Sequence, residues 1–300
     1  MNRREFAAVA AGAALAGRAG LAQSPQFKKS ICVGVFPRGT PLVESFKRAK
    51  SAGFDGLEIP VGGEIKLEST DAEVKTIAQA ARDSGIMIVS AWASQALGEN
   101  WLNNPDPAVR QKGVDGVKRT MEIARMLDCD AMLMVTGRLG SGVRFLVNYD
   151  DSWNRVTAEM QKLVPFASQA KVTMTPENVW NKWLVSSRDM RDFVDQFKSP
   201  WVGAHFDVGN IVQYGYPEDW IEVLGARIKR IHLKDYKMAA GAGQGRFVGL
   251  MEGDVNWKGV MAALVKAGYR GWLSPEYGPD PNDSDLKKMS ETVDKIIALA

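Results

Sequence analysis

Four residues with metal-binding side chains stand at the ends of short apolar runs in the second half of the chain: Glu177, Asp207, His232 and Glu276. Three carboxylates and one imidazole make an oxygen-rich ligand set, which suits Mn²⁺ or Mg²⁺, with Co²⁺ and Zn²⁺ as alternatives. Each acidic residue alone is equally well explained as a helix cap or a salt-bridge partner. Four such residues on four consecutive runs are harder to explain in that way, and the pattern predicts one divalent metal site.

Side-chain alternation predicts which way these residues face. His232 lies between Ile231 and Leu233, which suit the apolar side of a strand, so His232 and Lys234 are expected to point the opposite way together. By the same rule His205 and Asp207 share a face. The chain has only 2 histidines, which excludes any mechanism that needs a cluster of them.

The apolar runs alternate with amphipathic segments, as strands and helices do in an α/β fold. The predicted strands are 30–36, 56–61, 86–93, 131–137, 172–179, 202–210, 230–236 and 271–278. The predicted helices are 41–52, 71–84, 107–127, 151–170, 187–197, 217–228, 257–267 and 283–299. An open doubly wound sheet would also alternate, but eight strand–helix units in 300 residues favour a single (β/α)8 TIM barrel.

A closed barrel would bring the four candidate ligands together, because its active site lies at the C-terminal ends of the strands. No linker divides the chain, and the glycine-rich segments 137–142 and 239–245 are interpreted as active-site loops within single strand–helix units. Several helices are expected to begin at a residue that can cap the first turn. These residues are Thr40, Thr70, Ser187 and Asn256.

Residues 1–22 are interpreted as an export signal of the twin-arginine type. Arg3, Arg4 and Phe6 precede a short run of Ala, Val, Gly and Leu, and residues 20–22 are small enough for a signal peptidase. That export machinery carries folded proteins, which suits a protein that must take up its metal first. A disordered tail or an uncleaved anchor is the alternative. We therefore expect a periplasmic or otherwise exported bacterial protein, with the export machinery as a partner and residues 23–300 as the barrel.

The composition is that of an ordinary globular protein, with 45% hydrophobic and 24% charged residues. The formal net charge of +3 lacks the basic excess of a nucleic-acid binder. No other stretch reaches the length of a transmembrane segment, so no stable membrane insertion is expected. Cys32 and Cys129 are expected to be buried free thiols, although an exported protein would also permit one disulfide between them.

Several short motifs resemble the sugar isomerase and epimerase superfamily of xylose-isomerase-like TIM barrels, in particular its D-tagatose 3-epimerase branch. The motifs are GFDGLE at 53–58, PEN at 176–178, FDxGN at 206–210, HLKD at 232–235, EGDVNW at 252–257 and PE at 275–276. Their order and spacing extend the resemblance over residues 30–300. It implies that Glu177, Asp207, His232 and Glu276 bind one divalent metal, most often manganese.

The resemblance also implies a reaction. A metal bound to the carbonyl and hydroxyl oxygens of a sugar acidifies the intervening C–H and stabilises an enediolate. Glu177 and Glu276 would act as acid and base on the two faces of the sugar, giving epimerisation, or would move a proton between neighbouring carbons, giving isomerisation. The alternatives are a lyase or dehydratase that acts by β-elimination on a keto-sugar or 3-keto-glycoside, and a non-catalytic carbohydrate-binding barrel. The endonuclease branch is disfavoured by the scarcity of histidine.

The predicted substrate contacts depart from the family pattern. Relatives commonly have a histidine where this chain has Asn210, an arginine where it has Met238, and a glycine where it has Met251. The metal ligands therefore match while the residues around the sugar differ. The candidate substrate-binding residues are Glu58, Trp92, Asn210 and Lys234, with Trp180 and Trp183 as further stacking candidates. His205 and Asp235 are interpreted as supporting residues, and a homo-oligomer is compatible with the sequence.

Overall fold

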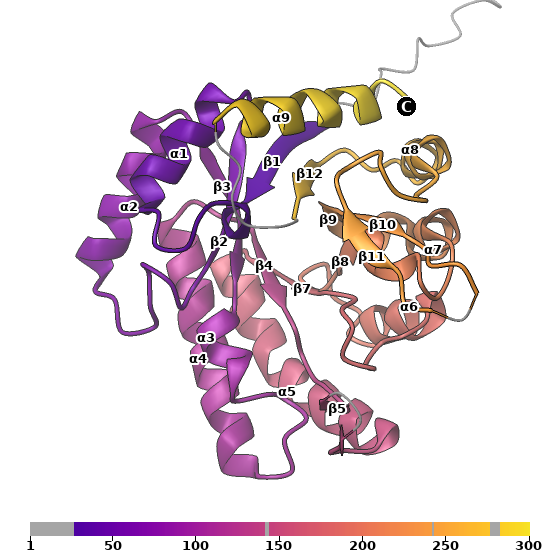
Figure 1. Cartoon of the computed structure of the whole chain (residues 1–300). Coiled ribbons are helices and arrows are strands. Elements are labelled where there is room, and N and C mark those ends of the chain that lie inside the picture. The colour runs from indigo at the N-terminus through magenta and orange to yellow at the C-terminus, as the bar shows by residue number, and fades with distance from the viewer. Residues whose placement is uncertain (1–26, 142–143, 242, 277–282) are drawn as a thin grey trace, which may run out of the picture.

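Eight parallel strands close into a barrel in the computed structural model, which describes residues 27–141, 144–241, 243–276 and 283–300 (Figure 1). The barrel strands are β1 (Lys28–Cys32), β2 (Gly56–Pro60), β3 (Met87–Trp92), β4 (Ala131–Met134), β7 (Thr173–Pro176), β8 (Ala204–Asp207), β9 (Ile228–Leu233) and β12 (Trp272–Pro275). Their hydrogen-bonded order is β7-β4-β3-β2-β1-β12-β9-β8. Parallel bridges from Met174 to Val202 and from Glu177 to His205 join β7 to β8. The predicted (β/α)8 barrel is therefore confirmed.

One long helix follows each barrel strand, and Figure 1 shows the helices outside the ring of strands. They are α1 (Leu42–Ser51), α2 (Asp71–Asp83), α4 (Pro107–Met126), α5 (Tyr149–Ala170), α6 (Ser187–Asp195), α7 (Pro217–Leu224), α8 (Trp257–Lys266) and α9 (Asp283–Ile297). Each overlaps its predicted range. Their apolar residues bury against the sheet in one continuous core, which supplies the main stabilisation of the fold.

Two of the four predicted helix caps are confirmed. Thr70 and Glu73 form a capping box at α2, and the Asn256 side chain accepts a hydrogen bond from the Gly259 amide at α8. At α6 the cap is Ser186, one residue before the predicted Ser187. Thr40 is not a cap, because its hydroxyl donates to the Pro37 carbonyl instead.

Shorter elements that the sequence did not predict lie after the barrel strands. They are the helix α3 (Ser94–Gly98) and the hairpins β5 (Gly140–Ser141) with β6 (Arg144–Phe145) and β10 (Asp235–Lys237) with β11 (Arg246–Val248). The predicted strands were too long at their C-terminal ends, and residues 33–35 form a 3₁₀ turn instead of extending the first strand. The apolar pattern continues past the last ladder hydrogen bond because these segments still fold over the core.

Two further expectations concern membrane-spanning segments and the two cysteines. Within the described residues no helix is long and apolar enough to cross a membrane, and Cys32 and Cys129 are both buried and unpaired, as expected. The predicted export signal at 1–22 and the end of the strand predicted at 271–278 lie outside the described residues.

Candidate metal centre

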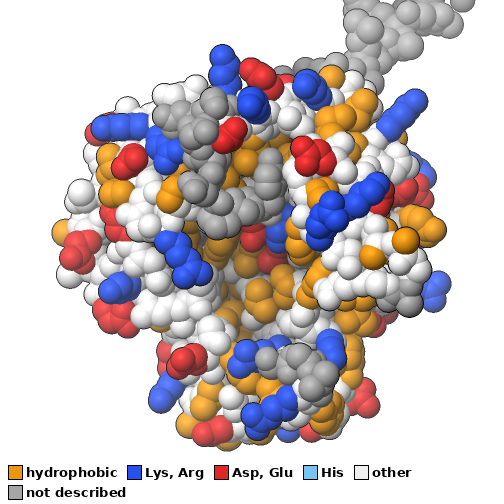
Figure 2. Space-filling view, in the orientation of Figure 1, with side chains coloured by type: hydrophobic (Ala, Val, Ile, Leu, Met, Phe, Trp, Pro, Cys, Tyr) orange, Lys and Arg blue, Asp and Glu red, His pale blue; other side chains and the backbone are white. Residues whose placement is uncertain are grey.

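The four predicted ligands converge at the C-terminal ends of four neighbouring strands. Asp207 ends β8, His232 lies near the end of β9, and Glu177 and Glu276 directly follow β7 and β12. Each offers one ligand atom, and these atoms all lie within 4.8 Å of one another. Asp207 and His232 have no exposed surface, and Glu177 is 7% exposed. On the face shown in Figure 2, a central hollow has acidic side chains on its floor and hydrophobic side chains around them.

The His232 imidazole is the centre of this cluster. Its Nδ1 lies 2.7 Å from Glu276 Oε2 and 2.9 Å from Glu177 Oε1, and 4.0 Å from Asp207 Oδ2. The Lys234 ammonium lies between two of these carboxylates, at 2.9 Å from Asp207 Oδ2 and 2.8 Å from Glu276 Oε2. His232 and Lys234 thus point to the same interior, as side-chain alternation predicted. The Lys234 side chain forms ion pairs with the carboxylates of the cluster.

The electrostatics of the cluster are those of a buried site with opposing charges. Burial raises the pKa of Glu177 to about 7 and also raises the pKa of Asp207. Burial acts in the same direction on Glu276, but the charges of His232 and Lys234 outweigh it and lower the pKa to about 2. Burial disfavours the imidazolium form of His232, yet the acidic groups packed around the ring hold its pKa well above the usual value. The site therefore favours a cation strongly.

The donor set fits a divalent ion. Asp207 Oδ2 and Glu276 Oε2 are buried and accept no hydrogen bond with good geometry, although Lys234 lies near both. Metal–oxygen and metal–nitrogen bonds of about 2.0–2.3 Å place ligand atoms roughly 3 to 4.6 Å apart, which is close to the spacing seen here. Carboxylate oxygens with one imidazole suit Mn²⁺ or Mg²⁺ better than a soft ion.

Glu58 was expected to contact the substrate, but its carboxylate is buried behind His232. Its side chain has no exposed surface, and its Oε2 lies 3.3 Å from His232 Nε2, on the side of the ring away from the cluster. Trp92 Nε1 and Ser274 Oγ also donate to it. Burial acts to raise the pKa of Glu58, but the two histidines and these hydrogen bonds hold it well below its usual range. An ionised Glu58 orients the imidazole so that Nδ1 faces the cluster.

Two asparagines brace Asp207. Asn178 accepts a hydrogen bond from the Asp207 amide and donates to the Asp207 carbonyl, at 2.8 and 2.9 Å. The Asn210 amide donates to Asp207 Oδ1, and its side chain donates to the Asn178 carbonyl. Asn210, a candidate sugar contact, therefore uses its side chain within the protein. Gly209 permits this arrangement, because a Cβ there would lie 2.8 Å from the Lys234 carbonyl oxygen.

The remaining candidates divide between the site and the core. Trp92 is half-buried, and its ring lies edge-on to His232 with centroids 6.0 Å apart. Trp180 is 38% exposed and packs against Phe247, whereas Trp183 is buried and donates to Thr136 Oγ1. His205 is buried beside His232, with ring centroids 4.1 Å apart. 

Asp235 braces the loop that follows β9, as expected. Its carboxylate accepts hydrogen bonds from the Tyr236 and Val255 amides and from Trp257 Nε1.

The signal for the Asn178 brace was present in the sequence, since an amide side chain directly follows a candidate ligand. The Glu58 position depends on a contact across the barrel and had no local signal.

The fold and this cluster define a (β/α)8 barrel with a carboxylate–imidazole centre at the C-terminal ends of its strands. Residues 46–296 match the family of xylose isomerase-like TIM barrels, and the chain belongs to that family. Several proteins to which the chain is similar are named as sugar epimerases.

The chain is 25% identical over 258 residues to L-ribulose-5-phosphate 3-epimerase UlaE of Salmonella paratyphi C, covering 81% of this chain and 86% of that protein. Its fold is similar to that of a D-psicose 3-epimerase from Clostridium cellulolyticum H10, with a TM-score of 0.75, 16% identity and coverage of 91% and 99% of the two chains. It is also similar to 3-keto-D-glucoside 4-epimerase YcjR from E. coli, with a TM-score of 0.70, 13% identity and coverage of 91% and 100%.

Proposed function

We propose that this protein is a metal-dependent sugar isomerase or epimerase that moves a proton on a carbon next to a carbonyl. The observation that carries the proposal is the convergence of two glutamates, an aspartate and a histidine within 4.8 Å at the mouth of the barrel. The epimerase names of its relatives support the same reaction class. Glu177, Asp207, His232 and Glu276 would hold the ion, with Mn²⁺ preferred.

The bound ion would polarise the sugar carbonyl and acidify the neighbouring C–H. Glu177 and Glu276 come from the outer two of four neighbouring strands, β7, β8, β9 and β12, so they bracket the centre. In the proposed mechanism one carboxylate oxygen takes the proton and leaves an enediolate, and the other returns a proton to the opposite face, which inverts the carbon. Return of the proton to the neighbouring carbon gives isomerisation.

The neighbouring residues support this chemistry in distinct ways. The Asp207 and Glu276 carboxylates raise the pKa of Lys234 despite its burial, so it stays an ammonium and can stabilise negative charge on a sugar oxygen. Trp92 is proposed to contact the sugar beside His232. Glu58 and Asn210 are proposed as positioning residues that fix His232 and Asp207.

The proposed site of action is outside the cytoplasm. The paired arginines and apolar run of residues 1–22 support export by the twin-arginine route, with the mature chain beginning near residue 23. Cell fractionation of the full-length protein and of an Arg3→Lys, Arg4→Lys variant tests this proposal. Retention of both in the cytoplasm would refute it.

A screen of keto-sugars and 3-keto-glycosides with the Mn²⁺-loaded protein in D₂O tests the proposed reaction. We expect solvent deuterium at one carbon of a recovered or rearranged sugar, and loss of that exchange in Glu177→Gln and in Glu276→Gln. Glu159→Gln, a buried glutamate outside the centre, is the matched control and should keep the exchange. Release of water or of an aglycone would assign the β-elimination reaction instead. Full exchange in both centre variants would refute the two-carboxylate mechanism.

A further inference from the structure

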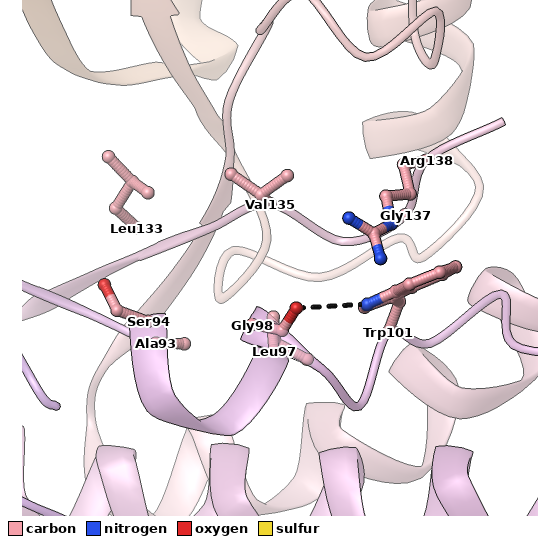
Figure 3. A pocket seen from close by; sticks show the side chains of 9 residues that line it. All are labelled: Ala93, Ser94, Leu97, Gly98, Trp101, Leu133, Val135, Gly137 and Arg138. Carbon is pink, nitrogen blue, oxygen red and sulfur yellow. Dashed lines mark hydrogen bonds between the residues drawn. The ribbon is translucent and has the colours of Figure 1, made fainter. Parts of the chain in front are cut away.

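We infer that Arg138, held against Trp101, binds an anionic group at the far end of the sugar, so that the substrate is an acidic sugar. This inference rests on the proposed function and adds the substrate class. The two residues line a pocket of about 230 Å³ at the ends of β3 and β4, drawn in Figure 3. At about 30 Å³ for each water in the liquid, that volume equals roughly eight waters. It has room for a carboxylate or a phosphate with part of a carbon chain.

Arg138 is a half-buried cation without an anionic partner among the described residues. Its guanidinium lies 3.3 Å from the centroid of the Trp101 ring, and its buried Nε has no hydrogen-bond partner. Burial lowers its pKa, as expected for a cation that no carboxylate compensates. Two other half-buried arginines pair with acids: Arg110 with Glu159, and Arg155 with Asp151. The free donors of Arg138 therefore distinguish it from a structural arginine.

The surrounding contacts fix Arg138 before any ligand arrives. Trp101 Nε1 donates to the Gly98 carbonyl at 3.1 Å, which sets the plane of the indole under the guanidinium (Figure 3). The Asn103 side chain donates to the Arg138 carbonyl at 2.7 Å and accepts from the Arg138 amide at 3.4 Å. A guanidinium stacked on an aromatic ring keeps its N–H edge available, and little freedom is lost when an anion binds.

Two residues that line the pocket directly follow residues that contact the candidate metal centre. Val135 lines it and directly follows Met134, whose carbonyl accepts the Glu177 amide at 3.1 Å. Ala93 lines it and directly follows Trp92, which lies beside His232. Three residues of extended chain, about 10 Å at most, separate Val135 from Arg138. In the inferred complex the reacting carbons of the sugar lie at the centre, and the other end of its chain extends past Val135 to the guanidinium.

The chemistry of the pocket selects the type of group. A guanidinium offers two parallel N–H donors that match the oxygens of a carboxylate or a phosphate. Ser94 adds a hydroxyl, whereas Leu97, Leu133 and Val135 are apolar. A pocket with one guanidinium and otherwise mostly apolar side chains favours a single terminal anion over a neutral hydroxymethyl group, because only the anion compensates the charge of the half-buried Arg138.

Three sugars that differ only at C6 test the inference: D-fructose, D-fructose 6-phosphate and D-fructuronate. Their affinities for the Mn²⁺-loaded full-length chain are measured by calorimetry, with inorganic phosphate alone as a fourth probe. We expect one or both anionic sugars to bind about 10- to 100-fold more tightly than D-fructose, as charged hydrogen bonds allow. Whichever anionic sugar binds more tightly than D-fructose shows whether the site accepts a phosphate or a carboxylate. Arg138→Gln should remove the gain and change the D-fructose affinity by less than about twofold.

The control removes one positive charge near the start of β4, at the opposite end of that strand from Arg138. Arg125 is exposed near the end of α4, where it contacts the Ala170 carbonyl, and Arg125→Gln should keep the preference for the anion. Equal affinity of the wild-type protein for all three sugars overturns the inference alone, as does an equal loss for all three in Arg138→Gln. Phosphate binding that depends on Arg138 without binding of any sugar supports the anion site and counts against the proposed function. Binding of none of the four probes overturns both.

Discussion

Replacement of Glu58 by glutamine separates the role of this carboxylate from that of a substrate contact. Glu58 accepts hydrogen bonds from Trp92 Nε1 at 3.0 Å and from Ser274 Oγ, and its Oε2 lies 3.3 Å from His232 Nε2. Ser274 Oγ also lies 2.6 Å from Ser30 Oγ, and either of these two hydroxyls can be the donor. Glutamine has nearly the same shape but replaces one acceptor oxygen by an NH₂ group, so this buried network holds more N–H and O–H donors than acceptors and one donor is left without a partner.

The structure sets the size of two separate effects. A buried donor left without a partner costs about 1–3 kcal/mol, so the free energy of unfolding of metal-free Glu58→Gln should fall by that amount. Loss of the carboxylate behind a metal-binding histidine weakens metal affinity about 10- to 100-fold, because His232 Nδ1 loses both its orientation and part of its basicity. A substrate contact would instead leave the metal affinity unchanged and alter only the sugar affinity.

Urea unfolding and Mn²⁺ titration calorimetry measure the two effects. Glu159→Gln is the control, because Glu159 is also buried and pairs with Arg110 at 2.9 Å but lies outside the centre. It should lose stability and keep the wild-type Mn²⁺ affinity. The positioning role of Glu58 is refuted if Glu58→Gln binds Mn²⁺ as tightly as the wild-type protein.

Three further predictions concern the rest of the barrel. Burial opposes ionisation of Glu159, but its hydrogen bonds to Lys162 and Arg110 outweigh burial and lower its pKa. The contribution of Glu159 to the stability of the folded protein is therefore complete above the unfolded pKa of about 4.3, and it is lost as the pH falls through the folded pKa. The free energy of unfolding should consequently fall less steeply with decreasing pH in Glu159→Gln than in the wild-type protein below about pH 4. Identical slopes for the two proteins would contradict this prediction. Burial raises the pKa of both thiols, that of Cys129 to about 12, so a thiol reagent at mildly alkaline pH should label neither cysteine until the protein is unfolded; prompt labelling of the folded protein would be inconsistent with their burial. Gly113→Ala should destabilise α4 by about 1–3 kcal/mol in thermal unfolding because its Cβ would overlap a backbone carbonyl, whereas Gly98→Ala, with open space around it, should change stability by less than about 1 kcal/mol.

Local sequence patterns were sufficient to predict the barrel and the convergence of the four candidate ligands. Each strand and each long helix carries its own periodicity, and parallel closure then forces every strand end to the same side. The alternation of Ile231, His232, Leu233 and Lys234 gave the facing of β9, because Ile231 and Leu233 are fully buried in the apolar core. Strand ends were predicted too late because apolar residues continue after the ladder stops.

The features missed from sequence depend on contacts between distant parts of the chain. Glu58 and His232 are 174 positions apart, and nothing near Glu58 indicates that its carboxylate faces a histidine across the barrel interior. Arg138 and Trp101 belong to loops after different strands, so their stacking has no local pattern. Asn210 was expected at the sugar because of its place in a motif, whereas its hydrogen bond to the Asn178 carbonyl appears only once β7 and β8 lie side by side.

The direct test of the proposed centre is a Mn²⁺ titration of the full-length protein followed by electron paramagnetic resonance. Four ligand atoms within 4.8 Å of one another predict one tightly bound ion per chain. Asp207→Asn and His232→Gln should abolish that binding, while Glu159→Gln should keep it. A wild-type protein that binds no Mn²⁺, or binding that persists unchanged in both centre variants, would contradict the account.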